Sequence, residues 1–111
     1  MKKILILIIV TSSFSITNAQ TTPAEQLANK IAQKMKDTLS LSDAQKQSIY
    51  QANLQLHNQK LQVRQQQIQI DSLTNRIQVI EKTRDTLYHS HLSAQQYQLY
   101  KQKKRNLISN N

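Results

Sequence analysis

The sequence contains no cysteine, glycine or tryptophan, and only one proline among its 111 residues. Without cysteine the chain has no disulfide framework, no thiolate metal site and no thiol nucleophile. Without glycine it lacks phosphate-binding loops and two-residue hairpin turns, because both need positive φ angles or a close backbone approach. These absences favour a single small helical domain that is not an enzyme and carries no cofactor.

Acidic residues are also scarce in this chain. It has 6 Asp and Glu against 15 Lys and Arg, a formal net charge of +9, and 18 glutamines. No spacing aligns two carboxylates with a nucleophile, so we expect the acidic side chains of the central region to be exposed ion-pair partners of arginines. The residues concerned are Asp71, Glu81 and Asp85, with Arg64, Arg76 or Arg84 as partners.

The N-terminus has the features of a signal peptide. Two lysines follow the initial methionine, residues 4–10 are an unbroken apolar run, and a polar stretch of mostly small residues leads to Ala19. The run is shorter than the ~20 residues that span a bilayer, which argues against an uncleaved anchor. We expect a signal peptide over residues 1–19 and export to a bacterial periplasm. Cleavage removes both lysines, so the net charge falls from +9 to +7 in the mature chain, residues 20–111.

Three capping boxes mark three helix starts, at Thr22, Ser42 and Ser93. In each box the hydroxyl accepts a hydrogen bond from the first turn, and a Glu or Gln three positions later bonds back. The boxes therefore predict that a helix begins directly after each hydroxyl residue.

The segments between these starts determine the expected fold. Apolar residues recur at helical spacing in 23–39 and, more weakly, in 93–107. We favour one long central helix over 43–88. The alternative is a hairpin that turns at 71–75, the only cluster of weak helix formers within it. The expected fold is all-α, with three to four helices in one domain over residues 20–111.

Two rows of apolar residues run along the central segment. Each row repeats every seven residues, and the rows lie about 200° apart around a helix, so this helix has partners on two sides. We expect Ile49, Leu56, Val63 and Ile70 of the first row to meet a second chain in a dimer, and the second row to face the first helix or a bound client. The first row is Ile49, Leu56, Val63, Ile70 and Ile77, and the second is Leu54, Leu61 and Ile68.

The sequence Leu41-Ser42-Asp43-Ala44-Gln45 has a counterpart in Leu92-Ser93-Ala94-Gln95-Gln96. The pair resembles the two Leu-Thr-x-x-Gln motifs of the Spy/CpxP family of small periplasmic proteins, with serine in place of threonine in both copies. This resemblance covers about residues 24–105. It implies an elongated antiparallel dimer shaped as a shallow cradle, and an ATP-independent chaperone or envelope-stress role. The residues that carry it are Leu41, Ser42, Gln45, Leu92, Ser93 and Gln96.

Basic and apolar side chains are the candidate client-binding residues. Cations attract acidic unfolded chains at long range, and exposed apolar side chains then bind them loosely. The candidates are Lys30, Lys34, Lys36, Leu54, Leu61, Ile68, Lys101, Lys103, Lys104 and Arg105.

His89 and His91 are weak candidates for a metal site. Residues two apart on a helix point about 200° from each other, so both reach one ion only from a loop or across a dimer. No neighbouring carboxylate completes the ligand set. We therefore expect no bound metal and interpret these histidines as part of a polar connection before Ser93.

The favoured function is that of an exported, ATP-independent chaperone-like protein, a homodimer that binds unfolded, stress-damaged or acidic client proteins. The alternative is a coiled-coil adaptor or accessory protein of a membrane-bound envelope-stress sensor. A minor third hypothesis is attachment to anionic lipid or polysaccharide. Nucleic acid is not an expected partner of an exported protein, although Tyr97 and Tyr100 precede a basic run.

Overall fold

The computed structural model describes residues 21–108, which form four helices and no strand: α1 (Pro23–Leu39), α2 (Asp43–Gln65), α3 (Ile70–His89) and α4 (Ala94–Ile108). The all-α prediction is confirmed. The expected signal peptide, residues 1–19, lies outside the described residues. No helix within residues 21–108 combines the length and the apolar character that crossing a bilayer requires.

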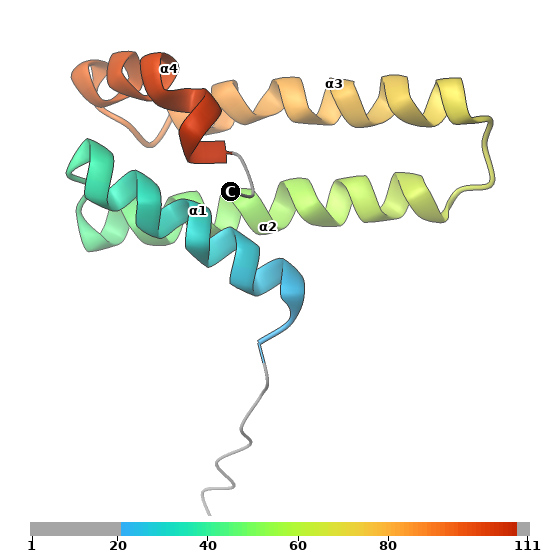
Figure 1. Cartoon of the computed structure of the whole chain (residues 1–111), viewed down its shortest axis with the longest axis horizontal. Coiled ribbons are helices and arrows are strands. Elements are labelled where there is room, and N and C mark those ends of the chain that lie inside the picture. The colour runs from blue at the N-terminus through green and yellow to red at the C-terminus, as the bar shows by residue number, and fades with distance from the viewer. Residues whose placement is uncertain (1–20, 109–111) are drawn as a thin grey trace, which may run out of the picture.

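Helices α2 and α3 form an antiparallel hairpin, and the chain turns between them over residues 66–69 (Figure 1). The single long helix expected over 43–88 is therefore wrong. The turn also comes earlier than residues 71–75, where the hairpin alternative placed it. Residues 71–75 instead lie in the first turns of α3, where the carboxylate of Asp71 is favourable beside the positive end of the helix.

The turn has almost no sequence signal, which is why it was not predicted. Gln66 ends α2 with an extended backbone (φ −75°, ψ 133°), and Gln69 precedes α3 with a similar one (φ −61°, ψ 147°) and no side-chain cap. What favours the turn is the contact that it allows, because each helix covers apolar side chains that a straight helix would leave in water. Near the turn, Arg76 Nη1 donates to Gln66 Oε1 at 2.6 Å.

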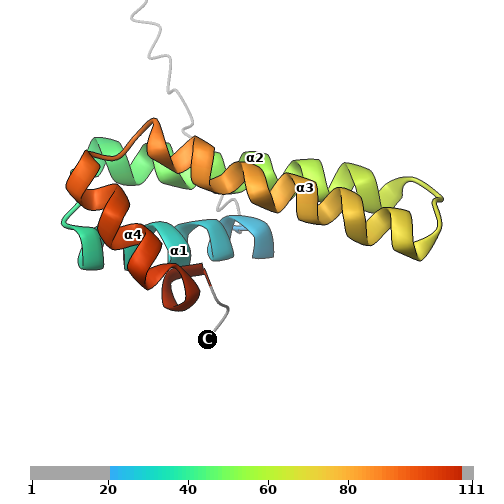
Figure 2. The same cartoon turned by 90° about the horizontal axis from the view of Figure 1, so that it is seen from above.

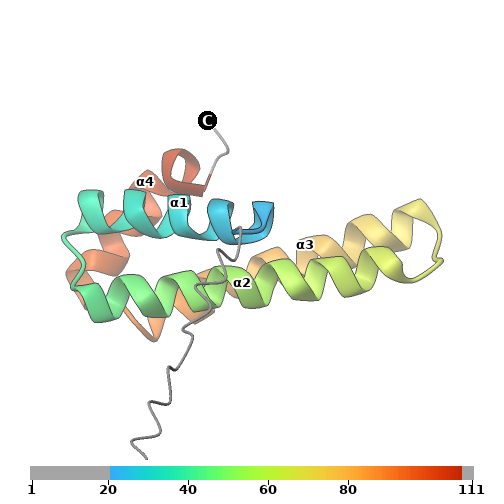
Figure 3. The ribbon, with the colours of Figure 1, turned by 90° about the horizontal axis from the view of Figure 1, so that it is seen from below.

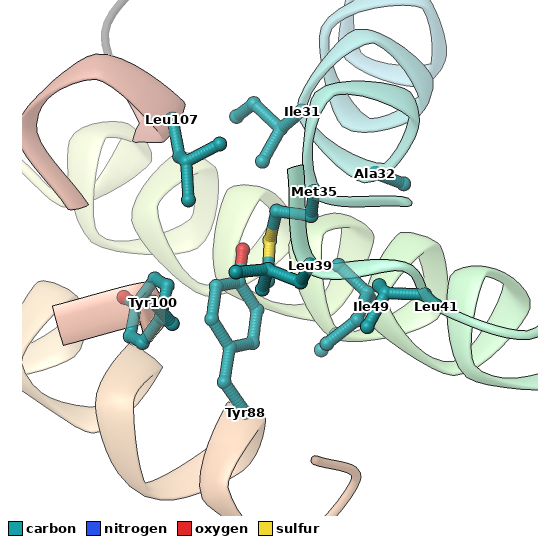
Figure 4. Close-up of a cluster of buried hydrophobic side chains, with 10 residues drawn as sticks. Ile31, Ala32, Met35, Leu39, Leu41, Ile49, Tyr88, Tyr100 and Leu107 are labelled. Atoms are coloured by element: carbon teal, nitrogen blue, oxygen red, sulfur yellow. The ribbon is translucent and has the colours of Figure 1, made fainter. Parts of the chain in front are cut away.

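The core lies where α1 and α4 cover one face of one half of the hairpin (Figures 2 and 3). Tyr88 of α3 and Tyr100 of α4 are fully buried, and their ring centroids lie 5.1 Å apart in an edge-to-face arrangement (Figure 4). Met35 of α1 and Ile49 of α2 are fully buried as well. The buried cluster comprises Ile31, Ala32, Met35, Leu39, Leu41, Ile49, Ala52, Tyr88, Tyr100 and Leu107.

This core corrects the expected dimer contact of the first apolar row. Ile49 and Leu56 both have 0% exposure within one protomer, so neither is available to a second chain. The reason is that α2 is covered over this length by α1 and α3. Farther along the row, Val63 is half-buried and Ile70 is 71% exposed. The row therefore divides into a buried part and an accessible part.

The other half of the hairpin projects beyond α1 and α4 (Figures 1 and 3). We call residues 57–83 the arm. No residue of the arm is buried, although α2 and α3 lie side by side along it. Three large apolar side chains in it are exposed, Leu61 at 43%, Ile70 at 71% and Val79 at 62%. One protomer therefore has a packed base and an arm without a core of its own.

The connection between α1 and α2 shows how the chain makes a tight helix end without glycine. Ser40 takes the left-handed conformation (φ 54°, ψ 51°) that glycine usually supplies at this position. Its backbone N–H and that of Leu41 both donate to the carbonyl of Lys36. This geometry reverses the chain and directs Leu41 into the core.

Candidate functional site

The two Leu-Ser-x-x-Gln motifs begin α2 and α4 as complete capping boxes. In the first, Ser42 Oγ accepts from the Gln45 backbone N–H at 3.1 Å, and the Ser42 N–H donates to Gln45 Oε1 at 2.9 Å. In the second, Ser93 and Gln96 make the same two bonds at the same distances. The predicted box at Thr22 is only half formed, because Glu25 accepts from the Thr22 hydroxyl.

The motifs also contact each other, which their sequence did not indicate. Gln45 Nε2 donates to Gln96 Oε1 at 2.7 Å, and Gln96 Nε2 donates to Gln45 Oε1 at 3.2 Å. Gln45 Nε2 also donates to the His91 carbonyl at 3.1 Å. We call Gln45 and Gln96 the glutamine pair. It joins the first turn of α2 to the first turn of α4 across 51 residues of sequence.

The leucine of each motif packs inward. Leu41 is 5% exposed and belongs to the buried cluster, and Leu92 is half-buried and packs against that cluster. Each motif therefore has three structural roles. Its leucine anchors the segment in the core, its serine hydroxyl caps the helix, and its glutamine forms a contact between helices. The six motif residues predicted from the sequence therefore meet at the base of the molecule.

The candidate client-binding cations lie on α1 and α4, the two helices that cover the base. Lys36 Nζ lies 2.5 Å from Asp43 Oδ1, and its hydrogen bond lowers the pKa of that carboxyl. Lys104 Nζ lies 2.8 Å from Asp85 Oδ1. The Lys101 ammonium is 5.5 Å from the centroid of the Tyr97 ring, within range of a cation–π contact. The exposed cations of the set are Lys30, Lys101, Lys103 and Arg105, and the half-buried ones are Lys34, Lys36 and Lys104.

The candidate apolar residues do not form one continuous row. Leu54 is half-buried on α2, Leu61 is exposed on the arm, and Ile68 lies in the turn rather than on a helix. Val79 is not among the residues predicted from the sequence, and Ile70 is predicted to form a dimer contact, although both are more exposed than Leu61.

A buried polar network at the root of the arm was not predicted either. Arg84 is 6% exposed, and its Nη1 donates to Asn53 Oδ1 at 3.0 Å and to the Tyr88 hydroxyl at 2.7 Å. Tyr88 also donates to Asn53 Oδ1, and Asn53 Nδ2 donates to the Ala28 carbonyl at 3.0 Å. The network therefore connects α1, α2 and α3. Burial raises the pKa of Tyr88 to about 12, so the phenol stays protonated.

The carboxylates of α3 complete this network. Glu81 Oε1 lies 2.5 Å from Arg84 Nε, and Glu81 also forms an ion pair with Lys60 of α2. Asp85 accepts from the Tyr100 hydroxyl at 2.7 Å. The expectation of exposed ion pairs is thus wrong for Arg84, whose charge is buried because both ends of its guanidinium have partners within the fold.

The histidines occupy two different environments. The His89 ring lies edge-on to Tyr97, with centroids 4.5 Å apart, and His91 is exposed in the connection before α4. Among residues 21–108 no group of three His, Cys, Asp or Glu side chains is arranged to hold a metal ion. His91 contributes to the fold through its backbone carbonyl, which accepts a hydrogen bond from Gln45 Nε2.

Comparisons with protein-family models, with curated proteins and with solved structures give no match to this chain. The resemblance to the Spy/CpxP family therefore stays a prediction based on two five-residue motifs. The structure itself adds that these motifs cap two helices and bond to each other.

Proposed function

We propose that the protein is an exported, ATP-independent chaperone-like protein that binds unfolded or stress-damaged proteins. The observation that carries this proposal is the uncovered arm, with Leu61, Ile70 and Val79 exposed to solvent. Apolar area removed from water contributes about 25 cal/mol per Å², so a partner that covers these side chains gains free energy. Leu61 lies on α2, and Ile70 and Val79 lie on α3, so both helices of the arm contribute. Exposed apolar patches mark interaction sites.

Charge supports the same proposal. The described residues include 13 of the 15 basic side chains, all but Lys2 and Lys3, and all 6 acidic ones, which gives the folded part a net charge of +7. A positive surface raises the rate at which acidic chains arrive, and apolar contacts then slow their release. A cleaved signal peptide over residues 1–19 and a periplasmic location complete the proposal.

We further propose that two protomers associate through their arms into an elongated antiparallel homodimer. Val63, Ile70 and Val79 replace the original first-row contact, because Ile49 and Leu56 are already buried. Sedimentation equilibrium at tens of micromolar protein should give a dimer. Val79→Lys, which places a charge on the exposed face of α3, should shift it toward monomer. A wild-type monomer at this concentration contradicts the dimer but leaves client binding open.

The test of client binding is an aggregation assay with two unrelated unfolded proteins. The mature chain should slow aggregation of both, and the triple variant Leu61→Gln, Ile70→Gln, Val79→Gln should lose most of that effect. A control with Gln62→Asn and Gln78→Asn changes neighbouring exposed polar positions and leaves the three apolar side chains in place. If the wild type protects neither client, the chaperone proposal is wrong.

The adaptor of a membrane-bound sensor is the second candidate, and the same arm favours it. A two-helix arm that lacks its own core resembles half of a helical bundle. A single partner with a complementary helical surface can complete that bundle. Breadth of binding separates the two proposals. A chaperone acts on several unrelated proteins, whereas an adaptor binds a single partner and leaves both aggregation assays unchanged.

A further inference from the structure

The root of the arm concentrates positive charge around one carboxylate. Two cations, Lys60 and Arg84, line the same small pocket, of about 60 Å³. In the described part of the chain, Glu81 is the only carboxylate that forms ion pairs with these two cations, and it bonds to both Lys60 and Arg84. The neighbouring carboxylate, Asp85, is directed toward α4, where it bonds to Tyr100 and Lys104.

Helix α1 adds no charge that offsets these cations. It contributes only Ala24, Leu27, Ala28 and Ile31 to the pocket. From α2 the charged group facing Glu81 is Lys60, and from α3 the groups are Arg84 and the protonated phenol of Tyr88. The balance of charge at the junction of the three helices thus depends on the ionisation of Glu81.

Protonation of Glu81 removes that balance in acid. Burial raises the pKa of Glu81, but the hydrogen bonds from Arg84 and Lys60 outweigh burial and leave the pKa below its ordinary value. Because the pKa is lower in the folded state, the carboxylate stabilises the fold fully above the ordinary range of ~4.3, and this stabilisation is lost as the pH falls through the lowered value.

We propose that Glu81 is an acid-sensitive latch: when it is neutralised, Lys60 and Arg84 lose their shared partner and repel each other, and α2 and α3 separate along the arm. The arm opens before the base unfolds, because the arm has no buried residue and the base holds the whole buried cluster. Opening exposes Ile77 and Ile80, which are half-buried between the helices. This inference concerns the fold and does not depend on the proposed client binding.

The absence of cysteine makes the opening directly measurable. Spin labels on Gln62→Cys and Gln78→Cys report on the two sides of the arm, because both positions are exposed. They also lie between the contacts Lys60–Glu81 and Arg76–Gln66. The mean distance between labels should increase reversibly from pH 7 to pH 3, at a pH where near-ultraviolet circular dichroism still reports the packed tyrosines of the base.

Two substitutions test the latch itself. Glu81→Gln in the labelled chain should give the open distance at pH 7 and little further change in acid. Adding Lys60→Gln to Glu81→Gln removes one cation and should restore a shorter distance. The matched control is Asp37→Asn, an exposed carboxylate on α1 far from the arm, which should leave the wild-type pH profile unchanged.

Three results would overturn the proposal. They are a label distance that stays constant down to pH 3, a Glu81→Gln chain that is closed at pH 7, and an opening that coincides with loss of the tyrosine signal. The last result means global acid unfolding rather than a latch. The wild-type pH series needs no change at Glu81, so it decides the question even where Glu81→Gln does not fold.

Discussion

At the scale of single residues, the motif serines and glutamines carry most of the specificity at the base. Each serine satisfies a backbone donor that the helix start leaves unpaired, and each glutamine bonds both to its own cap and to the other glutamine. Such polar contacts are worth little individually but determine which helix ends come together, because an unpaired amide in a partly buried contact is costly.

The caps give the first residue-scale prediction. Ser42→Ala and Ser93→Ala should each lower the free energy of unfolding by about 1 kcal/mol, because each removes the acceptor for a first-turn N–H. Urea denaturation measures this change. A serine-to-alanine change at Ser90, whose hydroxyl donates to the carbonyl of Leu87, serves as the control and should cost less.

The glutamine pair gives the second residue-scale prediction. In a double-mutant cycle, Gln45→Ala and Gln96→Ala should show a coupling energy of about 0.5–1.5 kcal/mol, because the two side chains bond to each other. Gln47→Ala with Gln98→Ala, both exposed, should be additive. Additive effects for the glutamine pair would show that its members act only as separate caps.

At the scale of helices, the α2–α3 hairpin divides one apolar row into two parts with different tasks. Leu56 is fully buried at the base, whereas Val63, one heptad later, is half-buried on the arm. The residues are alike in sequence context and in helical phase. Leu56 and Val63 differ only in their position relative to α1, which covers α2 at the base but does not extend along the arm (Figure 3).

This division predicts unequal costs for the same kind of truncation. Leu56→Ala should lower the free energy of unfolding by about 2–5 kcal/mol, because it leaves a cavity in the core. Val63→Ala should cost less than about 1 kcal/mol in a monomer, because a half-buried side chain has less to lose. Chemical denaturation at low protein concentration measures both. A large cost for Val63→Ala that grows with protein concentration would instead report an arm–arm dimer.

At the scale of the whole molecule, the candidate client-binding cations lie on α1 and α4 at the base, whereas the most exposed large apolar side chains lie on the arm. The α4 cations and the arm are therefore separate surfaces that act at different stages of binding. Long-range attraction depends on the total field and is screened over about 8 Å at physiological salt, whereas apolar contacts are not screened.

The corresponding prediction concerns rates. Changing Lys101, Lys103, Lys104 and Arg105 to glutamine should slow the capture of acidic clients more than it speeds their release, and raised salt should slow capture by the wild type. Stopped-flow fluorescence with a labelled acidic client measures both rates. Lys104 also pairs with Asp85, so a variant that keeps Lys104 controls for lost stability. If the rate of capture changes neither with salt nor with the glutamine substitutions, the adaptor proposal is favoured.

The sequence by itself determined the helical class, the three helix starts and the ends of α1. These features are local: capping hydroxyls, apolar spacing and the lack of glycine act within a few residues of where they stand. The same local rules placed Leu41, Ser42, Gln45, Leu92, Ser93 and Gln96 as structural motifs before any contact between them was known.

Only the tertiary structure decided where the central segment turns and which apolar residues stay exposed. The turn at 66–69 has no glycine, proline or cap, so its position depends on which fold-back best covers α2 and α3. The burial of Arg84 and Asn53 likewise depends on three helices meeting at one point. Long-range contacts of this kind leave no spacing in the sequence, because residues far apart in the chain become partners only when the helices pack.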